Sequence, residues 1–494
     1  MIFDTIIIGG GISGLTSALI LARHGRRVAV VEQAKEPAPL VRGFHREGIY
    51  FDSAFHYAGG FGEGEVLDLF CRYLGLNEKL TKVPLSDQSY DVFRDSETGR
   101  EIAFRRGVAA LRESFSKSFP EQAVGIAGYL SDLEHCCRTL PFLNLEASAV
   151  DWNIGAAMQG PSLAEVLAGR IGNPELRHLF SLHTLLHGVF PQEVSFAFHA
   201  GVAVPYYHSA CRLAGGGRSL AAAFVGQLAV SGVQVFLGRG VKRLCFSSAG
   251  SLSGVELGDG ETLACRECLV SIHPRRFLDL VPEGALRPAY RKRLMNLEET
   301  VSGYVLFLSG PRRPQLLAAS NLYLGPFGSG TDGRLQSLER RPLFVSGAAP
   351  APGSGTECGW TVICPADWGE MGIATERGRG GEEAYLAAKE AVVGRIVQRL
   401  KREAPEIVDG ARVVAAATPL TLRDYCGGPR GGIYGVKHGI GQYNPQAATR
   451  IPGVYLCGQA TAAPGLLGTM VSAFLACGQI FGHERLRGEV LAWR

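Results

Sequence analysis

The chain has 494 residues, of which 46% are hydrophobic and 19% charged, so its composition excludes a disordered protein and allows a large buried core in two or three domains. The formal net charge of +4 is small for this length, which argues against a nucleic-acid partner. There is no apolar window of about 18 residues, and Asp4 stands where a signal peptide is basic. We therefore expect a cytoplasmic protein whose contact with a membrane, if it makes one, is at the surface.

The N-terminus predicts a strand, a glycine-rich turn and a helix. The β-branched run from Thr5 to Ile8 is typical of a buried parallel strand, and apolar residues then recur at helical spacing from Ile12 to about His24. The turn between them has the spacing GxGxxG, at Gly9, Gly11 and Gly14.

These glycines fit a dinucleotide-binding turn. Gly9 lets the chain turn sharply, Gly11 lacks the Cβ that would block a phosphate, and Gly14 lets the helix pack close to the strand. The N–H groups at the helix start, from Ile12 onward, then face the pyrophosphate, and the Ser13 hydroxyl adds a further donor.

An acidic residue closes the second predicted strand. Glu32 follows the run 28–31, and an acid at this position accepts hydrogen bonds from the ribose hydroxyls of an adenosine and repels a 2′-phosphate. NADP is therefore disfavoured here, whereas NAD and FAD both remain open. The predicted contacts of this unit are Gly9, Gly11, Ile12, Ser13, Gly14, Glu32 and Gln33.

In the rest of the chain, segments with helical sequence patterns alternate with segments that have strand-like patterns. Helical patterns dominate 62–208, strands and a hairpin over 242–270 occupy 209–275, and strand-like runs in 276–408 indicate a second sheet. Within that last region we expect an exposed turn over 346–359 and an amphipathic helix over 381–402. Glycine-rich sequence returns over 409–494.

Cysteine and histidine spacings offer little sign of a metal site. The 12 cysteines are scattered, so free thiols are expected, and the single CxxC at Cys265 and Cys268 is typical of a strand entering the core. His183 and His187 have helical i, i+4 spacing, but no third ligand is evident. We interpret them as packing or substrate-channel residues and predict no metal.

Four further stretches resemble one family. Together with the N-terminal motif, they resemble the flavin-dependent phytoene desaturase, carotenoid isomerase and retinol saturase superfamily. This resemblance extends over nearly the whole chain. The pair His56-Tyr57 and the stretch 428–435 resemble its retinol saturase branch. The four stretches are 48–57, 206–220, 418–435 and 452–469.

The resemblance implies FAD as the cofactor, because the last stretch is similar to a second flavin-binding motif that an NAD dehydrogenase does not need. It implies contacts from Arg42 and from Val241, the latter near the adenine. The chain departs from the family at Ala38, Pro39 and Leu40, where Gly-Gly and Arg are usual. The second motif places Gly458, Gln459, Leu467, Gly468 and Thr469 near the flavin.

The implied fold is α/β: a Rossmann-like FAD-binding domain with a parallel sheet that is discontinuous in sequence, a mixed-sheet substrate domain and an inserted helical domain. The FAD-binding domain would comprise 1–61, 209–275 and 409–494. The helical substrate or lid domain would occupy 62–208, and the second sheet 276–408.

The implied activity is hydride transfer between flavin N5 and a carbon–carbon bond of an apolar polyene or isoprenoid, as a saturase or desaturase. Saturation also needs a proton, and His56, Tyr57, His208 and Tyr434 are the candidate catalytic donors. Three alternatives stay open: a carotenoid cis–trans isomerase, a flavin amine oxidase and a non-enzymatic prenyl-binding escort protein. The electron donor or acceptor is also left open.

Overall fold

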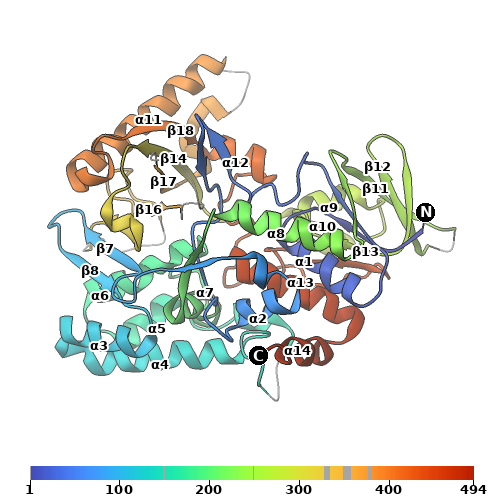
Figure 1. The fold of residues 1–494 in the computed structure, drawn as a ribbon, viewed down its shortest axis with the longest axis horizontal. Coiled ribbons are helices and arrows are strands. Elements are labelled where there is room, and N and C mark those ends of the chain that lie inside the picture. The colour runs from blue at the N-terminus through green and yellow to red at the C-terminus, as the bar shows by residue number, and fades with distance from the viewer. Residues whose placement is uncertain (1, 148–150, 249, 328–333, 349–357, 376–380) are drawn as a thin grey trace.

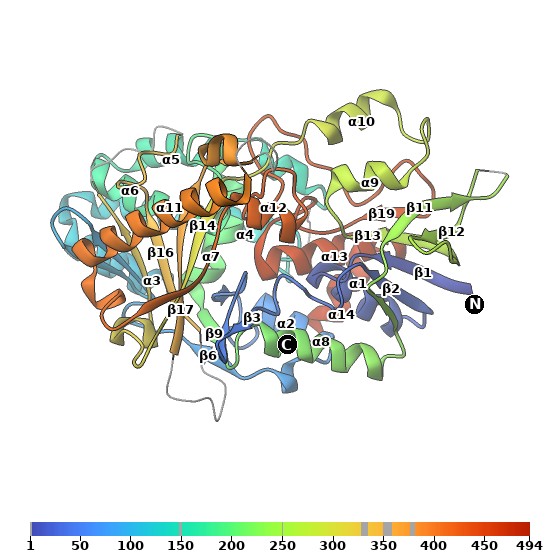
Figure 2. The ribbon, with the colours of Figure 1, turned by 90° about the horizontal axis from the view of Figure 1, so that it is seen from above.

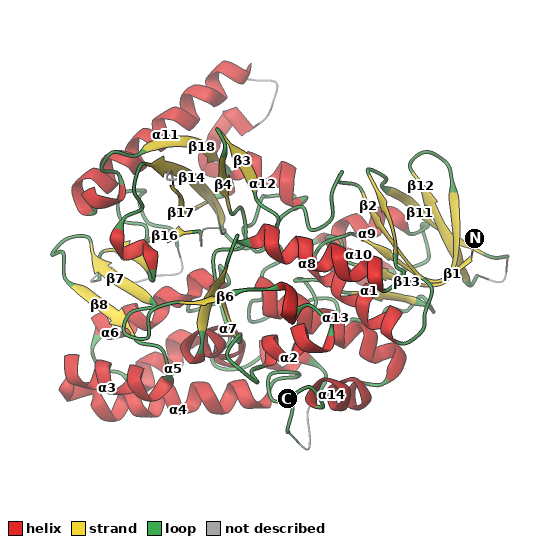
Figure 3. Ribbon diagram, in the orientation of Figure 1, coloured by secondary structure: helices red, strands yellow, loops and turns green. Residues whose placement is uncertain are grey.

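The computed structural model describes residues 2–147, 151–248, 250–327, 334–348, 358–375 and 381–494. Two seven-stranded sheets lie at opposite ends of the molecule, and a group of helices lies beneath the second sheet (Figure 1, Figure 3). The N-terminus belongs to the first sheet (Figure 2). The prediction of a mixed α/β fold is confirmed.

The first sheet is drawn from three distant parts of the chain. Its order is β10-β2-β1-β13-β12-β11, and β19 also pairs with β13. Strands β10, β2, β1, β13 and β19 are parallel. Strands β11, β12 and β13 pair antiparallel in the region where a hairpin was predicted. The bounds are β1 Ile2–Ile8, β2 Val28–Glu32, β10 Gln234–Leu237, β11 Val241–Phe246, β12 Leu252–Leu257, β13 Thr262–Val270 and β19 Val454–Leu456.

Helices cover both faces of this sheet because its central strands are apolar on both sides. On one face, Ile7 and Leu269 pack in a core with five helices, and on the other Ile6 and Val270 pack in a core with two. The first group is α1 Ile12–Arg23, α2 Val66–Tyr73, α8 Gly217–Val230, α13 Gly465–Phe481 and α14 His483–Leu491; the second is α9 Pro274–Leu280 and α10 Pro288–Met295.

The second sheet has the order β18-β14-β17-β16-β15-β7-β8, and only β15 and β7 pair in parallel. Strands β7 and β8 come from the predicted helical segment, so 62–208 and 276–408 share one sheet. The bounds are β7 Asp91–Asp95, β8 Glu101–Phe104, β14 Ser302–Gly310, β15 Asn321–Gly325, β16 Leu343–Gly347, β17 Cys358–Ala366 and β18 Arg412–Ala417.

The two faces of the second sheet have different cover. Helix α11 (Gly381–Glu403), which closely matches the predicted helix, packs on one face through Ile396 and Leu400 (Figure 2). Tyr323 and Phe344 on the other face pack into the core of the helical group. Of the turn predicted over 346–359, residues 349–357 lie outside the described part of the chain.

The helical group supplies the remaining large elements. Its helices are α3 Val108–Ser118, α4 Ala123–Thr139, α5 Leu163–Arg170, α6 Pro174–Ser181 and α7 Phe196–His208. Two small sheets pair β3 Phe44–Arg46 with β4 Ile49–Phe51, and β9 Ala210–Leu213 with β5 Ala58–Gly59 and β6 Lys82–Pro84. The other elements are η1 Asn77–Lys79, η2 Pro120–Gln122, η3 Ile154–Met158, η4 Leu182–Leu186, η5 Gln315–Ala318, η6 Trp368–Thr375, η7 Pro405–Ile407 and α12 Pro419–Cys426.

Among the described residues, none of the helices combines the length and apolar character needed to cross a bilayer.

Candidate functional site

Glycine-rich stretches from both ends of the chain meet at one edge of the first sheet. Strands β1 and β19 both pair in parallel with β13, so the loops after Ile8, Val270 and Leu456 lie together. Backbone bonds join them: the N–H of Ser271 donates to the Ile8 carbonyl at 2.8 Å, and that of Cys457 to Val270 at 2.9 Å. The carboxyl edge of parallel strands is where α/β sheets commonly bind ligands.

The turn after β1 requires its glycines for separate reasons. Gly9 has φ of +103° and its N–H donates to the Val31 carbonyl at 2.9 Å, a conformation that L side chains rarely adopt. A Cβ on Gly14 would overlap the Gly9 carbonyl oxygen. Helix α1 is therefore held directly against the end of β1.

The space beside Gly11 fits the phosphates of a dinucleotide. Gly11 is the N-cap of α1, and a Cβ built on it meets no described atom within 4 Å. The buried Ser13 hydroxyl makes no hydrogen bond of normal geometry with described residues; its neighbour is the Cys457 thiol. Open space and backbone N–H groups at a helix N-terminus favour an anion.

Glu32 is anchored at the rim of this turn. Its carboxylate accepts hydrogen bonds from the N–H groups of Gly10 at 2.6 Å and Ala34 at 2.7 Å, and the residue is 7% exposed. A carboxylate has about four acceptor sites, so capacity for ribose hydroxyls remains. The Arg239 N–H donates to the Glu32 carbonyl, and Gly240 lies near Gln33, which brings the start of β11 at Val241 to the same rim.

The second motif turns from β19 into α13. Gly458 has φ of +113°, and its N–H donates to the Ser472 hydroxyl at 2.6 Å. Gln459 packs on Gly435, while its carbonyl contacts His438 Nε2 at 2.7 Å. Leu467, Gly468 and Thr469 form the first turns of α13, and the Thr469 hydroxyl donates to helix carbonyls behind it.

The loop that departs from the family pattern is held by its own contacts. Ala38 is buried with φ of +53°, and its N–H donates to the Gly10 carbonyl at 2.8 Å. Arg42 pairs with Glu36 at 2.8 Å and donates to the Pro37 carbonyl. Arg42 therefore lies in the predicted neighbourhood, with its guanidinium engaged within the loop.

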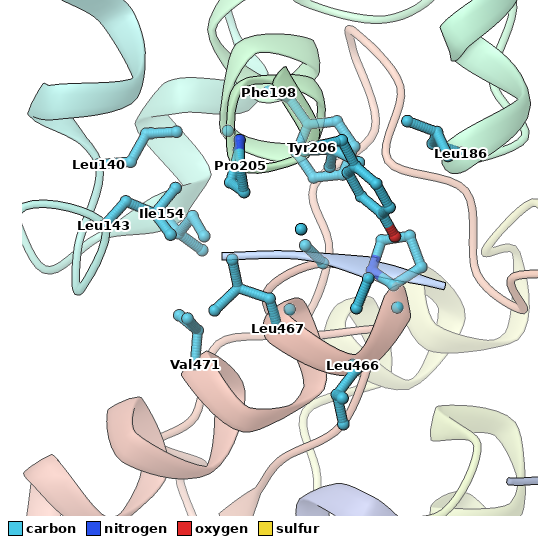
Figure 4. Close-up of a pocket in the computed structure, with 18 of the residues that line it drawn as sticks. Leu140, Leu143, Ile154, Leu186, Phe198, Pro205, Tyr206, Leu466, Leu467 and Val471 are labelled. Atoms are coloured by element: carbon cyan, nitrogen blue, oxygen red, sulfur yellow. The ribbon is translucent and has the colours of Figure 1, made fainter. Parts of the chain in front are cut away.

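An apolar pocket opens between α7 and the start of α13. Figure 4 shows Phe198, Pro205 and Tyr206 above it, and Leu466, Leu467 and Val471 below. Its volume is about 50 Å³. Its described lining is Ala58, Gly59, Leu140, Pro141, Leu143, Ile154, Leu186, Phe198, Gly201, Val202, Pro205, Tyr206, Ala463, Pro464, Gly465, Leu466, Leu467, Gly468 and Val471.

A second cavity adjoins this pocket and opens more widely to the surface. It shares Leu143, Pro205 and Leu467 with the pocket and has a volume of about 290 Å³. Charged side chains at its rim include Glu134 and Arg138. We call it the outer groove. The two cavities run from a mixed polar mouth to an apolar end beside α13.

Two of the predicted proton donors lie near the second sheet, outside the lining of the pocket. Burial lowers the pKa of His56 to about 4, with a further contribution from positively charged Arg212. His56 Nε2 is buried without a hydrogen-bond partner among the described atoms. The Tyr57 hydroxyl donates to Asp91 at 3.0 Å and lies 3.0 Å from the Tyr323 hydroxyl.

The other two candidates have different surroundings. His208 ends α7, is 45% exposed at its side chain, and pairs with Glu134 at 3.6 Å on the outer groove. Tyr434 is buried, and its hydroxyl donates to the Leu185 carbonyl at 2.8 Å. All four predicted candidates are therefore near the pocket region, but none contributes to the described pocket lining.

A buried polar cluster connects the second sheet to the helical group. Asp91 and His183 are both 0% exposed and lie 3.1 Å apart, and His183 Nδ1 lies 3.1 Å from the Tyr207 hydroxyl. The Asn321 amide donates to Asp91 at 2.8 Å. We call Tyr57, Asp91, His183, Tyr207 and Asn321 the Asp91 cluster.

The expected helical pairing of His183 and His187 is not found. His183 lies in the 3₁₀ segment η4, and His187 follows it. His183 contacts Asp91, whereas His187 Nε2 lies 3.0 Å from His199 Nδ1. Among the described residues, no three metal-ligating side chains form a group suited to an ion.

Tyr206 lines the pocket but is not among the residues predicted from the sequence. It belongs to the stretch 206–220, in which His208 is the predicted donor. The adjacent tyrosines gave one usable signal, since a phenol in an apolar segment needs a partner or a polar ligand. In the structure, Tyr206 lines the pocket and Tyr207 joins the Asp91 cluster.

Comparison with known proteins gives a consistent set of relatives. A family model described as flavin containing amine oxidoreductase matches residues 12–480. All-trans-retinol 13,14-reductase of Danio rerio is 25% identical, covering 99% of this chain and 87% of that protein. The Homo sapiens protein of the same name is 26% identical, covering 97% and 85%.

Solved structures share the fold at lower identity. An oxidoreductase from Methanosarcina mazei has a TM-score of 0.66 at 16% identity, covering 96% of this chain and 99% of that one. A putrescine oxidase variant has a TM-score of 0.66 at 13% identity, covering 100% of both chains.

Proposed function

The chain belongs to the flavin-containing amine oxidoreductase family, and we propose that it saturates a carbon–carbon double bond in a long apolar polyene or isoprenoid. It is an FAD-dependent oxidoreductase, which confirms the predicted cofactor and enzyme class. The predicted resemblance to the retinol saturase branch is likewise confirmed by the relatives. The substrate and the direction of hydrogen transfer are our proposal.

The residues at the edge of the first sheet fit FAD. Gly11 and the start of α1 would receive the pyrophosphate, and Glu32 the adenosine ribose. The first turn of α13, at Leu467 and Gly468, would approach the flavin. When bound, FAD supplies the hydride-exchanging centre that amino-acid side chains lack.

The observation that carries the proposal is the apolar pocket beside α13. Of its described lining, only Tyr206 has a polar side chain. Aliphatic walls stabilise an apolar chain by the hydrophobic effect and would exclude water from the reacting carbons. A polyene is the substrate class that suits such walls.

The size of the cavities indicates an elongated substrate. Pockets for small organic ligands usually span about 300–1,000 Å³, whereas this pocket has about 50 Å³. With the outer groove of about 290 Å³, the cavity volume reaches the lower end of that range. A substrate chain would therefore extend from the pocket past Leu467 into the groove. All-trans-retinol, which the relatives' names specify, is a polyene of this shape.

Amine oxidation is the main rival, because the family name and the putrescine oxidase neighbours indicate it. A protonated amine needs a carboxylate or a cluster of acceptors, since burying an unpaired charge is costly. None of the described pocket-lining residues carries a carboxylate. The pocket therefore favours an uncharged substrate.

The test is anaerobic. The purified flavoprotein is reduced chemically and offered single polyenes and isoprenoids, including all-trans-retinol, and the return of oxidised flavin absorbance is followed. We expect at least one polyene to reoxidise the flavin within one turnover and to be recovered with one double bond fewer.

Amines are the control arm of the same experiment, starting from oxidised flavin. Rapid bleaching of the flavin by an amine, with no reoxidation by any polyene, would contradict the proposal. Flavin oxidation by a polyene without loss of a double bond would also contradict it.

A further inference from the structure

Three tyrosines near the pocket have different surroundings. Tyr57 and Tyr207 have their hydroxyls in the Asp91 cluster, at 3.0 Å from Asp91 and 3.1 Å from His183. For Tyr206, no hydrogen bond of its hydroxyl is found among the described residues. One phenol of the three is therefore available to a ligand in the pocket.

The position of Tyr206 suits contact with a bound chain. It reaches from α7 with its hydroxyl directed toward the beginning of α13, where Leu466 and Leu467 form the facing wall (Figure 4). Its ring packs edge-to-face against Tyr57 at 4.9 Å between centroids. Because the Tyr57 hydroxyl donates a hydrogen bond to Asp91, the Tyr57 ring is held in place and supports Tyr206.

We propose that Tyr206 is the proton donor for double-bond reduction in this pocket. The inference rests on the proposed function. The π bond of the substrate would break, one carbon taking the hydride that bound, reduced FAD would supply and the other taking the phenolic proton of Tyr206. Two electrons would pass from the flavin to the alkene. The tyrosinate then regains a proton from water when the product leaves.

The surroundings of Tyr206 keep it protonated before reaction. Burial raises its pKa above the ordinary value for tyrosine, and the facing groups Tyr434, Asp91 and Cys211 act in the same direction. The supporting Tyr57 also faces it. A donor with a raised pKa stays protonated throughout the neutral and mildly alkaline pH range. By contrast, His56, whose pKa is about 4, would carry its donor proton only in acid.

The test compares Tyr206→Phe with Tyr207→Phe, the same change one residue along α7. Both variants are loaded with FAD, reduced anaerobically and mixed with the polyene that reoxidises the wild-type flavin. Removing a general acid typically costs about 10²–10⁴-fold in rate. We expect a loss of that size for Tyr206→Phe and less than about tenfold for Tyr207→Phe, with flavin content unchanged in both.

A second readout uses flavin-free protein. The 15 tyrosines are replaced by 3-fluorotyrosine, and the ¹⁹F resonance absent from Tyr206→Phe is assigned to Tyr206. We expect this resonance to shift when the polyene is added, because the phenol contacts the bound chain. We also expect Tyr206→Phe to bind the polyene within about threefold of wild type. The wild-type reoxidation rate should vary little between about pH 6 and pH 9.

Each contrary result has a distinct meaning. Full activity in Tyr206→Phe, or a wild-type rate that falls with an apparent pKa near that of histidine, overturns the role of Tyr206 alone. Polyene binding that weakens as much as the rate indicates a binding role, and also overturns it. If no polyene reoxidises the wild-type flavin, the proposed function fails, and this inference fails with it.

Discussion

The glycine-rich edge of the first sheet and the apolar pocket adjoin one another but are built differently. At the edge, the decisive features are backbone N–H groups and missing side chains, as at Gly9, Gly11 and Gly14. In the pocket, they are side chains from six separate segments of the chain. The first can be encoded in a short motif, whereas the second exists only after the helical group, α13 and β5 have packed together.

The pocket and the neighbouring Asp91 cluster also differ in their polar groups. The pocket has one polar side chain in its described lining, while the Asp91 cluster beside it gathers several buried polar groups. Because an unpaired buried polar group is costly, pairing them with one another leaves the pocket apolar. The contrast predicts that changes at the edge affect cofactor binding, and changes near the pocket affect stability or substrate.

The largest expected effect comes from filling the space beside Gly11. Its φ of −72° suits any residue, so Gly11→Val should fold normally while its side chain occupies the phosphate position. We expect FAD affinity to fall by roughly 10³-fold or more, since several hydrogen bonds to a charged group are lost at about 1.5–3 kcal/mol each. Flavin absorbance after dialysis measures this.

A matched substitution tests whether position 11 is special. Gly226 on α8 also has open space around its would-be Cβ, and Gly226→Val should retain FAD. Equal flavin retention in the two variants would refute the assignment of the edge.

Next in size is the removal of the central acid from the Asp91 cluster. Asp91→Ala leaves His183, Tyr57 and Asn321 buried with a partner missing. Breaking such a buried pair costs about 3–5 kcal/mol of stability. Urea unfolding of the holoprotein should show this loss. The surface substitution Asp87→Asn, at a side chain that is 64% exposed, should change stability by less than about 1 kcal/mol.

A smaller effect concerns pH and Asp52, which joins β4 to the start of α8. Burial is the main cause that raises the Asp52 pKa from 3.8 to about 6, against the lowering effect of hydrogen bonds from Tyr50 and Gly217. The folded protein therefore binds this proton more tightly than the unfolded chain. Its stabilising contribution is complete below about pH 4 and is lost as pH rises through about 6.

Replacing Asp52 with Asn isolates this dependence. Both hydrogen bonds end on Oδ1, which asparagine retains. We expect wild-type stability to fall by about 2 kcal/mol more than that of Asp52→Asn between pH 4 and pH 6. Parallel stability curves for the two proteins across that window would exclude the effect.

The smallest expected effect is at the shared wall of the two cavities. Leu467→Ala removes aliphatic surface that faces both the pocket and the outer groove. Polyene binding should weaken by about 1–2 kcal/mol, from the apolar area lost at about 25 cal/mol per Å². Fluorescence quenching of the flavin-free protein gives the Kd. Leu386→Ala, at an exposed side chain of α11, should leave the Kd unchanged.

Much of the fold followed from local patterns. The strand, turn and helix at 5–24, the acid at Glu32 and the helix over 381–402 are close to the observed elements, because hydrophobic period and glycine placement act over a few residues. The sequence patterns did not predict that strands from 62–208 belong to the second sheet. Strands β7 and β8 are short, and the pairing of β7 with β15 joins residues more than 200 positions apart.

The proton-donor candidates show the same limit. His56 and Tyr57 are adjacent to the pocket-lining Ala58, and His208 is two residues from Tyr206, so resemblance placed them in the correct neighbourhood. The hydrophobic pattern of α7 does not predict which side chain enters the pocket, because the helix is apolar on nearly all sides and lacks a single hydrophobic face.

By itself, the sequence predicted a dinucleotide-binding turn followed by an acid at Glu32, since this pattern depends on backbone conformation within about 30 residues. The tertiary structure decided that the second motif lies beside the first, and that Tyr206 faces the pocket while Tyr207 is paired with His183. The physical reason is that burial and hydrogen-bond partners come from residues distant in the chain, so neighbouring tyrosines on one helix acquire different roles only when the core forms around them.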